Sequence, residues 1–378
     1  MGGFQNGVPG SSDSAEMYDP FMDSVSALPS MGAARSEFGA ARLGNLICAV
    51  GGQDASTNAR LVTCECLDTT TNTWTDIGSL TTARYQHAVA SVGDTMCAIG
   101  GKDASGDPIA SVECYTDSTA VWTEVAALNT ARSGFGAAGI GNVVFALSGL
   151  SVGGGTPISS VEALDLSVSG GSWQEKAPMP TARSNVAVAS SGMKLFAVGG
   201  CGGNGNLNDQ LEVYESATDS WSTRAPMQTA RHSLGAAIVG NTLFCLGGSN
   251  LLQQNWQTLD VAEAYDIDSE SWHTVVSLGT PRQSFATVAG PATLPYDPCA
   301  AVDCGSHGAC VSPFGICTCT GGYTGEHCET LPACCSTLCY VCGSGTACDG
   351  CDGSCNSAGM DYCDAAHPQW DDDCDRSC

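Results

Sequence analysis

Residues 84–128, RYQHAVASVGDTMCAIGGKDASGDPIASVECYTDSTAVWTEVAAL, decide the fold. They contain four apolar runs, YQHAVASVG, TMCAIGG, SVECYT and WTEVAAL, which are separated by clusters of Gly, Asp and Ser. Apolar runs of this length without a helical period predict strands. This stretch therefore predicts a unit of four short strands.

The same unit recurs about every 50 residues, the period of kelch-type repeats. A glycine pair follows an apolar run in ICAVGG, CAIGG, FAVGG and FCLGG, and becomes Ser148-Gly149 in FALSG. Three further markers keep the same phase: an arginine at Arg35, Arg84, Arg132, Arg183, Arg231 and Arg282; a glutamate at Glu16, Glu65, Glu113, Glu162, Glu212 and Glu263; and a tryptophan at Trp74, Trp122, Trp173, Trp221 and Trp272.

Four-stranded sheets repeated around an axis make a β-propeller, in which each blade buries its faces against its neighbours. The glycine pair suits a place where the backbone turns tightly or passes close to another segment. The tryptophan of the fourth strand offers a large apolar plate for the gap between blades. The sequence therefore predicts an all-β, six-bladed ring.

The string GG…SVECY…W…L..AR resembles the kelch motif and covers residues 1–296. The resemblance implies a kelch β-propeller over this range. Two departures from the motif are expected to weaken individual blades. Ser148 replaces the first glycine of its pair, and Phe21 or Met22 stands where the first tryptophan is expected.

The start of the chain aligns with the middle of a unit, because MGGFQNGVPGSSDSAEMYD matches IGGKDASGDPIASVECYT. The segment after Arg282, QSFATVAGPATLPY, supplies a good first strand and a poor second one with Pro291 and Pro295. Strands from both termini could close the ring and remove its exposed edges; alternatively, the start of the gene model has been lost. We expect a ring of six blades closed by both termini in either case.

The composition changes at residues 297–329, where Cys299, Cys304, Cys310, Cys317, Cys319 and Cys328 frame a segment that resembles an EGF-like module. Six cysteines allow 15 pairings, so spacing alone leaves the connectivity open. The family pattern implies disulfides Cys299–Cys310, Cys304–Cys317 and Cys319–Cys328. The acidic motif of calcium-binding members does not precede the first cysteine. We expect a structural module without a calcium site.

Residues 330–378 form a cysteine-rich tail too small for a self-sufficient core, so it needs covalent or metal crosslinks. The pairs Cys339/Cys342 and Cys348/Cys351, with His367 nearby, allow a zinc site in a reducing compartment as the alternative. The pairs lie too close for the usual ribbon spacing and follow an EGF-like module. We expect a disulfide-stapled tail.

Cysteine usage places the protein in an oxidising compartment, secreted or extracellular. No signal peptide is visible at the start, which favours a truncated N-terminus. No apolar run is long enough to cross a bilayer, so direct membrane insertion is not expected. Attractin-like cell-surface proteins also join kelch and EGF-like modules, which supports this setting by analogy.

Two predicted blades carry a cysteine on the second strand and another on the third. We hypothesise disulfides Cys48–Cys66 and Cys97–Cys114; free cysteine acting as a small apolar residue is the equal alternative. A Cα separation above about 7 Å would exclude the bridges. Cys64, Cys201 and Cys245 have no evident partners, and the total of 23 cysteines is odd.

The formal net charge of −26 excludes a protein that binds nucleic acid through a basic face, and it disfavours docking on anionic lipid. An acidic run at Asp371, Asp372, Asp373 and Asp375 could bind divalent ions weakly, although solvated carboxylates are the simpler interpretation. We expect no cofactor and no metal site.

The six repeat arginines lie where one blade passes to the next, and these strand 4–1 connections should share a face of the disc with the strand 2–3 loops. In kelch propellers this face commonly receives partners, so the resemblance makes Arg35, Arg84, Arg132, Arg183, Arg231 and Arg282 candidate binding residues. The favoured alternative is structural, since arginine and glutamate recur together and could pair as buried ions.

Variation between the repeats concentrates in the loops after the glycine pairs, and loops on a rigid scaffold usually carry binding groups. The loop SNLLQQNWQT is the longest and most apolar. Its Trp256 lies outside the tryptophan series, which makes it a candidate exposed contact; covering the edge of its own blade is the alternative.

Some kelch propellers are galactose-oxidase-like or sugar-isomerising enzymes, and a copper oxidase would need converging histidine and tyrosine ligands. The propeller offers His87, His232 and His273 in differing repeat positions, and no base–nucleophile pair can be traced. We therefore predict no enzyme. The sequence predicts an extracellular module that binds a protein or glycan ligand through the loop face.

Overall fold

The computed structural model describes residues 1–5, 10–20, 22–153, 155–252, 255–290, 308–311 and 316–319, with the side chains of 251–256, 308–311 and 316–319 left undescribed. The chain divides into two compact units, Met1–Ala292 and Thr293–Cys378. In the described residues no helix occurs that could span a membrane.

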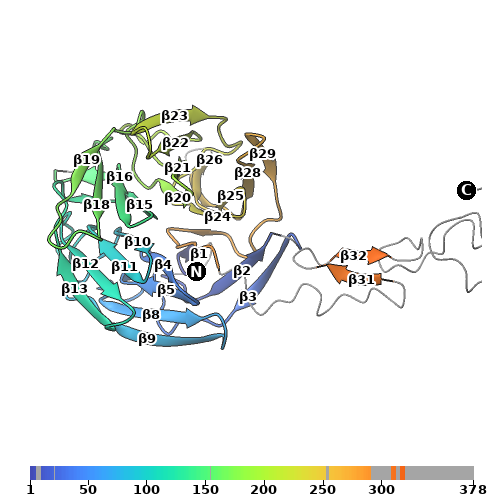
Figure 1. Ribbon diagram of the computed structural model, residues 1–378, viewed down its shortest axis with the longest axis horizontal. Coiled ribbons are helices and arrows are strands. Elements are labelled where there is room, and N and C mark those ends of the chain that lie inside the picture. Colours follow the sequence, from blue (N-terminus) through green and yellow to red (C-terminus); the bar gives the residue numbers. More distant parts are fainter. Residues whose placement is uncertain are drawn as a thin grey trace, which may run out of the picture. The chain divides into compact units, whose positions relative to one another are not determined.

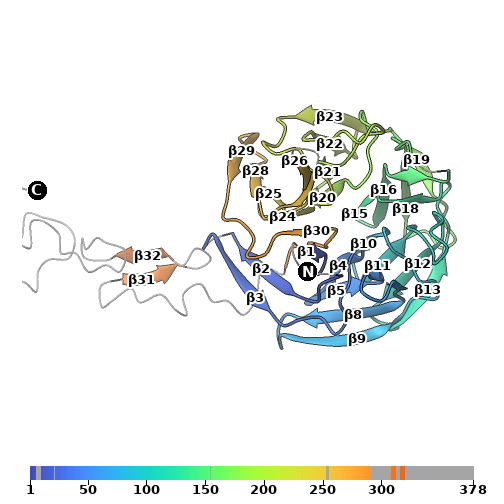
Figure 2. The ribbon, with the colours of Figure 1, turned by 180° about the vertical axis from the view of Figure 1, so that it is seen from behind.

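The first unit is a ring of antiparallel four-stranded sheets (Figures 1 and 2). In every blade the strands follow chain order from the centre outwards. Blade 1 contains β4 (Gly39–Leu43), β5 (Leu46–Val50), β8 (Thr63–Asp68) and β9 (Thr73–Ser79); blade 2 contains β10 (Ala88–Val92), β11 (Thr95–Ile99), β12 (Val112–Thr116) and β13 (Val121–Val125); blade 3 contains β15 (Gly136–Ile140), β16 (Val143–Leu147), β18 (Val161–Asp165) and β19 (Gln174–Lys176).

Two further blades complete the four-stranded set. Blade 4 contains β20 (Ala187–Ser191), β21 (Lys194–Val198), β22 (Leu211–Glu215) and β23 (Ser220–Arg224); blade 5 contains β24 (Gly235–Val239), β25 (Thr242–Leu246), β28 (Ala262–Asp266) and β29 (Ser271–Thr274). The four strands expected in residues 84–128 are thus confirmed as β10–β13.

Short strand pairs lie in the loops before and between the blade strands. They are β6 (Gln53–Asp54) with β7 (Ala59–Arg60), β14 (Arg132–Ser133) with β17 (Leu150–Ser151), β26 (Ser249–Leu252) with β27 (Asn255–Thr258), and β1 (Phe4–Gln5) with β30 (Arg282–Gln283). The pairing of β1 with β30 joins the two ends of the propeller segment.

The prediction of a six-bladed ring is wrong in its count of blades, because the described residues form five four-stranded blades. The sixth unit is a two-stranded sheet of β2 (Ala15–Asp19) and β3 (Ser24–Leu28). The segments that should flank it exchange backbone hydrogen bonds without forming assigned strands: Ala286 donates to the Met1 carbonyl at 3.2 Å, and the Met1 nitrogen donates to the Ala286 carbonyl at 3.1 Å.

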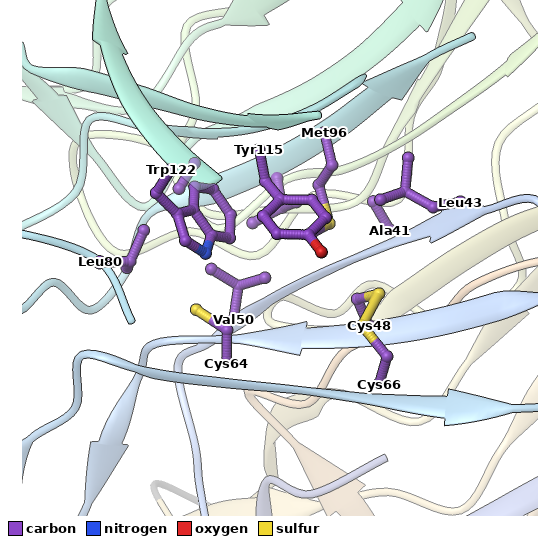
Figure 3. Close-up of a cluster of buried hydrophobic side chains, with 12 residues drawn as sticks. Ala41, Leu43, Cys48, Val50, Cys64, Cys66, Leu80, Met96, Tyr115 and Trp122 are labelled. Atoms are coloured by element: carbon purple, nitrogen blue, oxygen red, sulfur yellow. A yellow bond between two sulfur atoms is a disulfide. The ribbon is translucent and has the colours of Figure 1, made fainter. Parts of the chain in front are cut away.

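The cores lie between adjacent blades. The core between blades 1 and 2 includes Val50, Cys64, Met96, Tyr115 and Trp122 (Figure 3). Side chains from both ends of the propeller segment meet in one equivalent core, where Met1 and Ala286 pack with Phe38 and Ala49 of the blade 1 region. Burial of apolar surface between blades, at about 25 cal/mol per Å2, is what holds such a ring together.

Four of the five series tryptophans lie on the fourth strands, as predicted, and Trp173 directly precedes β19. The sixth unit lacks this tryptophan, but a different residue replaces it than expected. The strand register pairs Tyr18 with Val25, in the same way that it pairs Tyr265 with Trp272 in blade 5. Val25, rather than Phe21 or Met22, therefore occupies the tryptophan position. Met22 lies in the β2–β3 turn and is 54% exposed, and Phe21 is outside the described residues.

Both hypothesised blade disulfides are present. Cys48–Cys66 and Cys97–Cys114 each join directly opposed residues of the second and third strands, with Cα atoms 4.0 Å apart. Figure 3 shows the first of them beside the core of blades 1 and 2. Cys64, Cys201 and Cys245 are free thiols, and burial raises the pKa of Cys64 and Cys245 to about 12.

In the second unit the described strands are β31 (Gly308–Val311) and β32 (Ile316–Cys319), an antiparallel hairpin in which Cys310 and Cys317 are opposed. The predicted EGF-type pairings of Cys299, Cys304, Cys310, Cys317, Cys319 and Cys328 rest on side chains outside the described residues. The same holds for Pro291 and Pro295 and for the expected disulfide tail of residues 330–378.

Candidate functional site

All six repeat arginines are buried, at 0–1% exposure, and each pairs with the repeat glutamate of its own unit. Arg84 Nη2 lies 2.7 Å from Glu113 Oε1, for example. Four of the glutamates, Glu65, Glu113, Glu162 and Glu263, also bind the connection that enters the blade. Glu113, for example, accepts hydrogen bonds from the backbone N–H groups of Thr81 at 2.7 Å and Thr82 at 3.2 Å. In these four units the ion pair therefore fixes the entering loop to the third strand of the blade.

The arginines also connect to the glycine pairs. Arg35 Nη1 donates to the Gly51 carbonyl at 2.7 Å, and the same bond recurs in every unit, ending with Arg282 to Gly2 at 3.1 Å. The second glycine of each pair donates its N–H to the carbonyl of the next repeat arginine. Because each arginine makes the same buried contacts in every unit, the arginines stabilise the ring.

This geometry corrects the candidate binding role given to Arg35, Arg84, Arg132, Arg183, Arg231 and Arg282. Their side chains are buried, and their Nη atoms lie against glutamates and carbonyls inside the ring, so these groups are not exposed to a partner at its surface. Isolated buried cations would be costly, and pairing with hydrogen bonds offsets that cost. The structure supports the alternative, in which these arginines stabilise the ring.

Ser148 adapts to the first-glycine position that it occupies. Its φ of 67° is in the left-handed region where glycine is normally needed. Its hydroxyl donates to the Arg183 carbonyl and lies 3.0 Å from the Ile158 carbonyl. These side-chain bonds offset the backbone strain, so the blade forms despite the departure from the motif.

The pKa values of the buried pairs reflect the competition between burial and pairing. Burial lowers the pKa of Arg84, against the raising effect of Glu113. For Glu113, burial alone would raise the pKa, but the hydrogen bonds from Thr81 and the charge and hydrogen bond of Arg84 outweigh it and leave the pKa below its usual range. Both groups stay ionised at neutral pH.

The position two residues after each repeat arginine forms a second ring, which we call the mouth ring: Glu37, Gln86, Gly134, Asn185, Ser233 and Ser284. Each of these residues donates its backbone N–H to the carbonyl of the preceding member, at distances of 2.6–3.1 Å. The last link runs from the Glu37 N–H to the Ser284 carbonyl at 2.9 Å, so the chain of hydrogen bonds closes on itself.

All six mouth-ring residues have φ between 51° and 57°, although only one of them is glycine. Non-glycine residues in this region cost free energy and persist where the surroundings over-determine them, often at ligand sites. The six residues are half-buried, in contrast to the fully buried arginines two positions earlier. The mouth ring is therefore the place where each unit presents a variable group next to a fixed framework.

Glu37 is the one carboxylate of the mouth ring. Gln86 Nε2 donates to Glu37 Oε1 at 2.8 Å, and Gln53 Nε2 donates to Glu37 Oε2 at 2.6 Å. Burial raises the pKa of Glu37, opposed by the Gln86 hydrogen bond and by the charges of Lys102 and Arg60. The carboxylate is held in a fixed orientation and remains partly accessible.

A second group of side chains lies beside Glu37 on the loops of blades 1 and 2. The Arg60 guanidinium stacks on the Tyr85 ring at 4.3 Å, and Lys102 Nζ is 5.9 Å from the same ring. Tyr85 itself bridges to Lys102 through two backbone hydrogen bonds, of 2.8 and 3.1 Å. Strand 4–1 connections and strand 2–3 loops are thus joined on one face, as the sequence predicted.

Trp256, the other candidate contact, is placed only by its backbone. It lies on β27 opposite Leu251 of β26, in the strand 2–3 loop of blade 5. Its side chain is outside the described residues, so its exposure stays a prediction.

The three propeller histidines occupy different surroundings. His87 is 6% exposed between blades, His232 Nδ1 lies 2.7 Å from Ser233 Oγ at the mouth ring, and His273 lies on the outer strand β29. Across the described part of the chain, no group of three or more His, Cys, Asp or Glu side chains could hold a metal ion. The mouth ring presents amide, hydroxyl and carboxylate groups.

The mouth ring escaped the sequence analysis, which followed the residues that repeat. Its signal is a fixed position of variable identity: Glu, Gln, Gly, Asn, Ser and Ser, always two residues after the arginine. A polar or small residue that always lies two positions after the arginine, between positions that are buried in every unit, indicates a place where the framework is conserved from unit to unit while the exposed group varies.

Comparison with known families gives two matches. The kelch motif matches residues 34–81, 83–129, 182–228 and 230–279, and a teneurin-like EGF domain matches residues 300–330. The unit with Ser148 is not among the kelch matches, in keeping with its altered glycine pair. No curated protein matched the chain.

Among solved structures, one described as the structure of YjhT aligns with a TM-score of 0.61 at 14% identity, covering 69% of this chain and 89% of that one. At this identity the likeness concerns the fold alone. The kelch matches cover about half of the 378 residues and contain the arginine, the glutamate and the glycine pair of four of the six units seen in the ring. The chain belongs to the kelch-repeat family, and it carries an EGF-like segment after its propeller.

Proposed function

We propose that this protein is an extracellular interaction module that binds a protein or glycan ligand through the face of the mouth ring. Kelch propellers typically serve as interaction scaffolds, which supports binding rather than catalysis. The EGF-like match and the two blade disulfides support an oxidising, extracellular setting. The small modules, over 297–329 and 330–378, would then act as a spacer or a second contact.

The observation that carries this proposal is the oriented carboxylate of Glu37. Two amide donors, Gln53 and Gln86, hold it at the mouth while it remains half-buried. Fixed polar groups at the opening of a rigid ring provide orientation and specificity to a ligand at little entropic cost. A hydroxyl or ammonium group of the ligand would donate to this carboxylate.

The charge of the protein narrows the ligand class. A net charge of −26 repels anionic ligands at long range and raises the encounter rate with cationic ones, while it does not hinder neutral ones. The other mouth-ring side chains, such as Asn185 and Ser233, offer neutral hydrogen-bonding groups. A neutral glycan or a basic peptide segment therefore fits this face better than an acidic one.

The test uses the full chain, secreted with its disulfides formed and screened against an array of neutral and acidic glycans and a panel of receptor ectodomains. Any ligand found is then measured against Glu37→Gln, which keeps the shape and removes the charge, and against the control Lys194→Ala. Lys194 starts β21 at the opposite end of blade 4 and is half exposed. Selective loss with Glu37→Gln supports the proposal; a ligand that both variants bind equally well would refute this face as the site.

A further inference from the structure

In five of the gaps between neighbouring blades, the same side chain, the tryptophan of the repeat series, fills the space. The indole nitrogens of Trp74, Trp173, Trp221 and Trp272 each donate to a backbone carbonyl of the preceding unit, at 2.7–2.9 Å. The acceptors, Pro29, Ala126, Ala177 and Ala225, all lie six residues before a repeat arginine. Trp122 takes the same place but its nitrogen has no partner among the described residues.

A tyrosine lines this place in three blades. The ring centroids of Tyr265 and Trp272 are 5.1 Å apart, those of Tyr214 and Trp221 are 5.2 Å apart, and those of Tyr115 and Trp122 are 5.5 Å apart. These three tyrosines are 1–4% exposed. Between two blades, an indole ring therefore contacts a tyrosine ring in three cases and donates its N–H to a backbone carbonyl in four.

The sixth gap, between blade 5 and the β2–β3 sheet, contains the tyrosine position and the acceptor position but no tryptophan. Tyr18 occupies the tyrosine position, but the residue opposite it is Val25. Tyr18 is half-exposed, unlike Tyr214 and Tyr265, although its ring still packs on Phe244 with centroids 5.3 Å apart. The acceptor position, six residues before Arg282, is Val276.

A pocket of about 470 Å3 is present in this gap, lined by Tyr18, Asp23, Thr242, Phe244, His273 and Val275 among others. Its volume is in the range of small-ligand sites, roughly 300–1,000 Å3. The wall is held in place by Asp23, whose Oδ1 accepts hydrogen bonds from Tyr18 Oη at 2.8 Å and from the Val276 N–H at 2.9 Å.

We propose that this pocket binds an exposed tryptophan side chain of a partner protein. The indole would stack beside Tyr18 and donate its N–H to the Val276 carbonyl, in the arrangement that the chain's own tryptophans use in the other gaps. Buried tryptophans in preformed pockets are frequent sources of binding free energy at interfaces. The pocket involves the strand 1–2 hairpin of blade 5, so this site is separate from the mouth ring and does not depend on the function proposed for it.

The test uses the full secreted chain and the probe N-acetyl-L-tryptophanamide, observed by ligand NMR. The variant Val25→Trp introduces a tryptophan of the same chain at the position that carries one in the other blades. Val121→Trp is its control. Val121 lies on the fourth strand of blade 2 and is 54% exposed, so its replacement adds a tryptophan at the surface. We expect the wild-type protein to bind with a Kd of about 1 mM or tighter, and Val25→Trp to weaken binding at least about tenfold while Val121→Trp does not.

A second variant keeps the test decisive if Val25→Trp fails to fold. Val239 lies at the rim of the pocket and is 36% exposed, so Val239→Asp should preserve the fold and weaken probe binding several-fold. Three results would overturn the proposal: no binding by the wild-type protein, equal binding by the wild-type protein and the folded pocket variants, or binding that appears only after Phe21→Ala. The last would show that this neighbouring residue of the same chain occupies the pocket.

Discussion

Arg282 and Glu16, 266 residues apart in the sequence, form an ion pair with Nη2 and Oε1 2.8 Å apart. The corresponding pair in blade 2, Arg84 with Glu113, joins residues separated by 29 positions. The interaction that organises every unit is therefore also the one that connects the two ends of the propeller segment. Glu16 is 14% exposed at its side chain, against 2% for Glu113, so the connecting pair is the more hydrated of the two.

Arg84→Met should destabilise the propeller by about 3–5 kcal/mol, because it leaves the Glu113 carboxylate buried without its cation. Arg282→Met should cost less, because Glu16 is partly solvated. The check is the free energy of unfolding from guanidinium titration of the secreted protein. Lys194→Ala, which breaks an exposed pair with Glu215 at 3.8 Å, is the control and should change it by less than about 1 kcal/mol. Equal costs for all three variants would contradict the buried-pair account.

His87 should make the protein sensitive to mildly acidic pH. Burial, and then the charge of Arg84, lowers the pKa of His87 to about 3 in the folded state. The unfolded chain binds this proton below its usual pKa of about 6.5, so folded stability falls as the pH falls from there towards 3. His87→Phe uses the residue that Phe38, Phe135 and Phe285 provide at the same repeat position.

We expect the advantage in melting temperature of His87→Phe over the wild-type protein to widen as the pH is lowered from about 7 to 4. Differential scanning calorimetry at several pH values measures it. A difference that is independent of pH would mean that His87 does not titrate with unfolding.

Removing the Cys97–Cys114 disulfide should cost up to about 3 kcal/mol, the loop-closure contribution for a short crosslinked segment. Cys97→Phe with Cys114→Ala is the appropriate replacement, because blade 3 uses Phe145 opposite Ala163 in this place. The unfolding free energy of the double variant measures the crosslink with packing retained. No loss, together with reactive thiols at both positions in the native protein, would show that the bridge does not form.

The indole hydrogen bonds predict different costs for two similar substitutions. Trp173→Phe removes the bond from Nε1 to the Ala126 carbonyl at 2.9 Å and should cost about 1 kcal/mol beyond the loss of ring size. Trp122→Phe removes a buried N–H that has no partner among the described residues, and should cost less. Thermal unfolding of the two variants gives the comparison; a larger cost for Trp122→Phe would contradict it.

The sequence predicted the repeated framework well, because that framework uses the same residue types in every unit. Arginine, glutamate and the glycine pair recur in register, and a pairing of the two charged residues was the favoured interpretation. The cysteine pairs Cys48–Cys66 and Cys97–Cys114 were likewise predictable as directly opposed residues, although their oxidation was not.

Three features could not be predicted, for different physical reasons. The left-handed backbone of Glu37 and Gln86 is imposed by hydrogen bonds from neighbouring units rather than by residue type. The count of four-stranded blades depends on how the segments around Met1 and Ala286 pair, which propensity does not encode. Val25 was missed as the tryptophan substitute because its position follows from the register of the β2–β3 hairpin rather than from similarity of side chain.

The most direct test of the account is the affinity of an identified glycan or ectodomain ligand for the wild-type protein, Glu37→Gln and Lys194→Ala. The account predicts that Glu37→Gln raises the Kd by about tenfold or more, through loss of a charged hydrogen bond. It predicts an unchanged Kd for Lys194→Ala at the opposite end of the blades. An unchanged Kd for Glu37→Gln, with the variant folded, would contradict the central claim that the mouth ring binds the ligand.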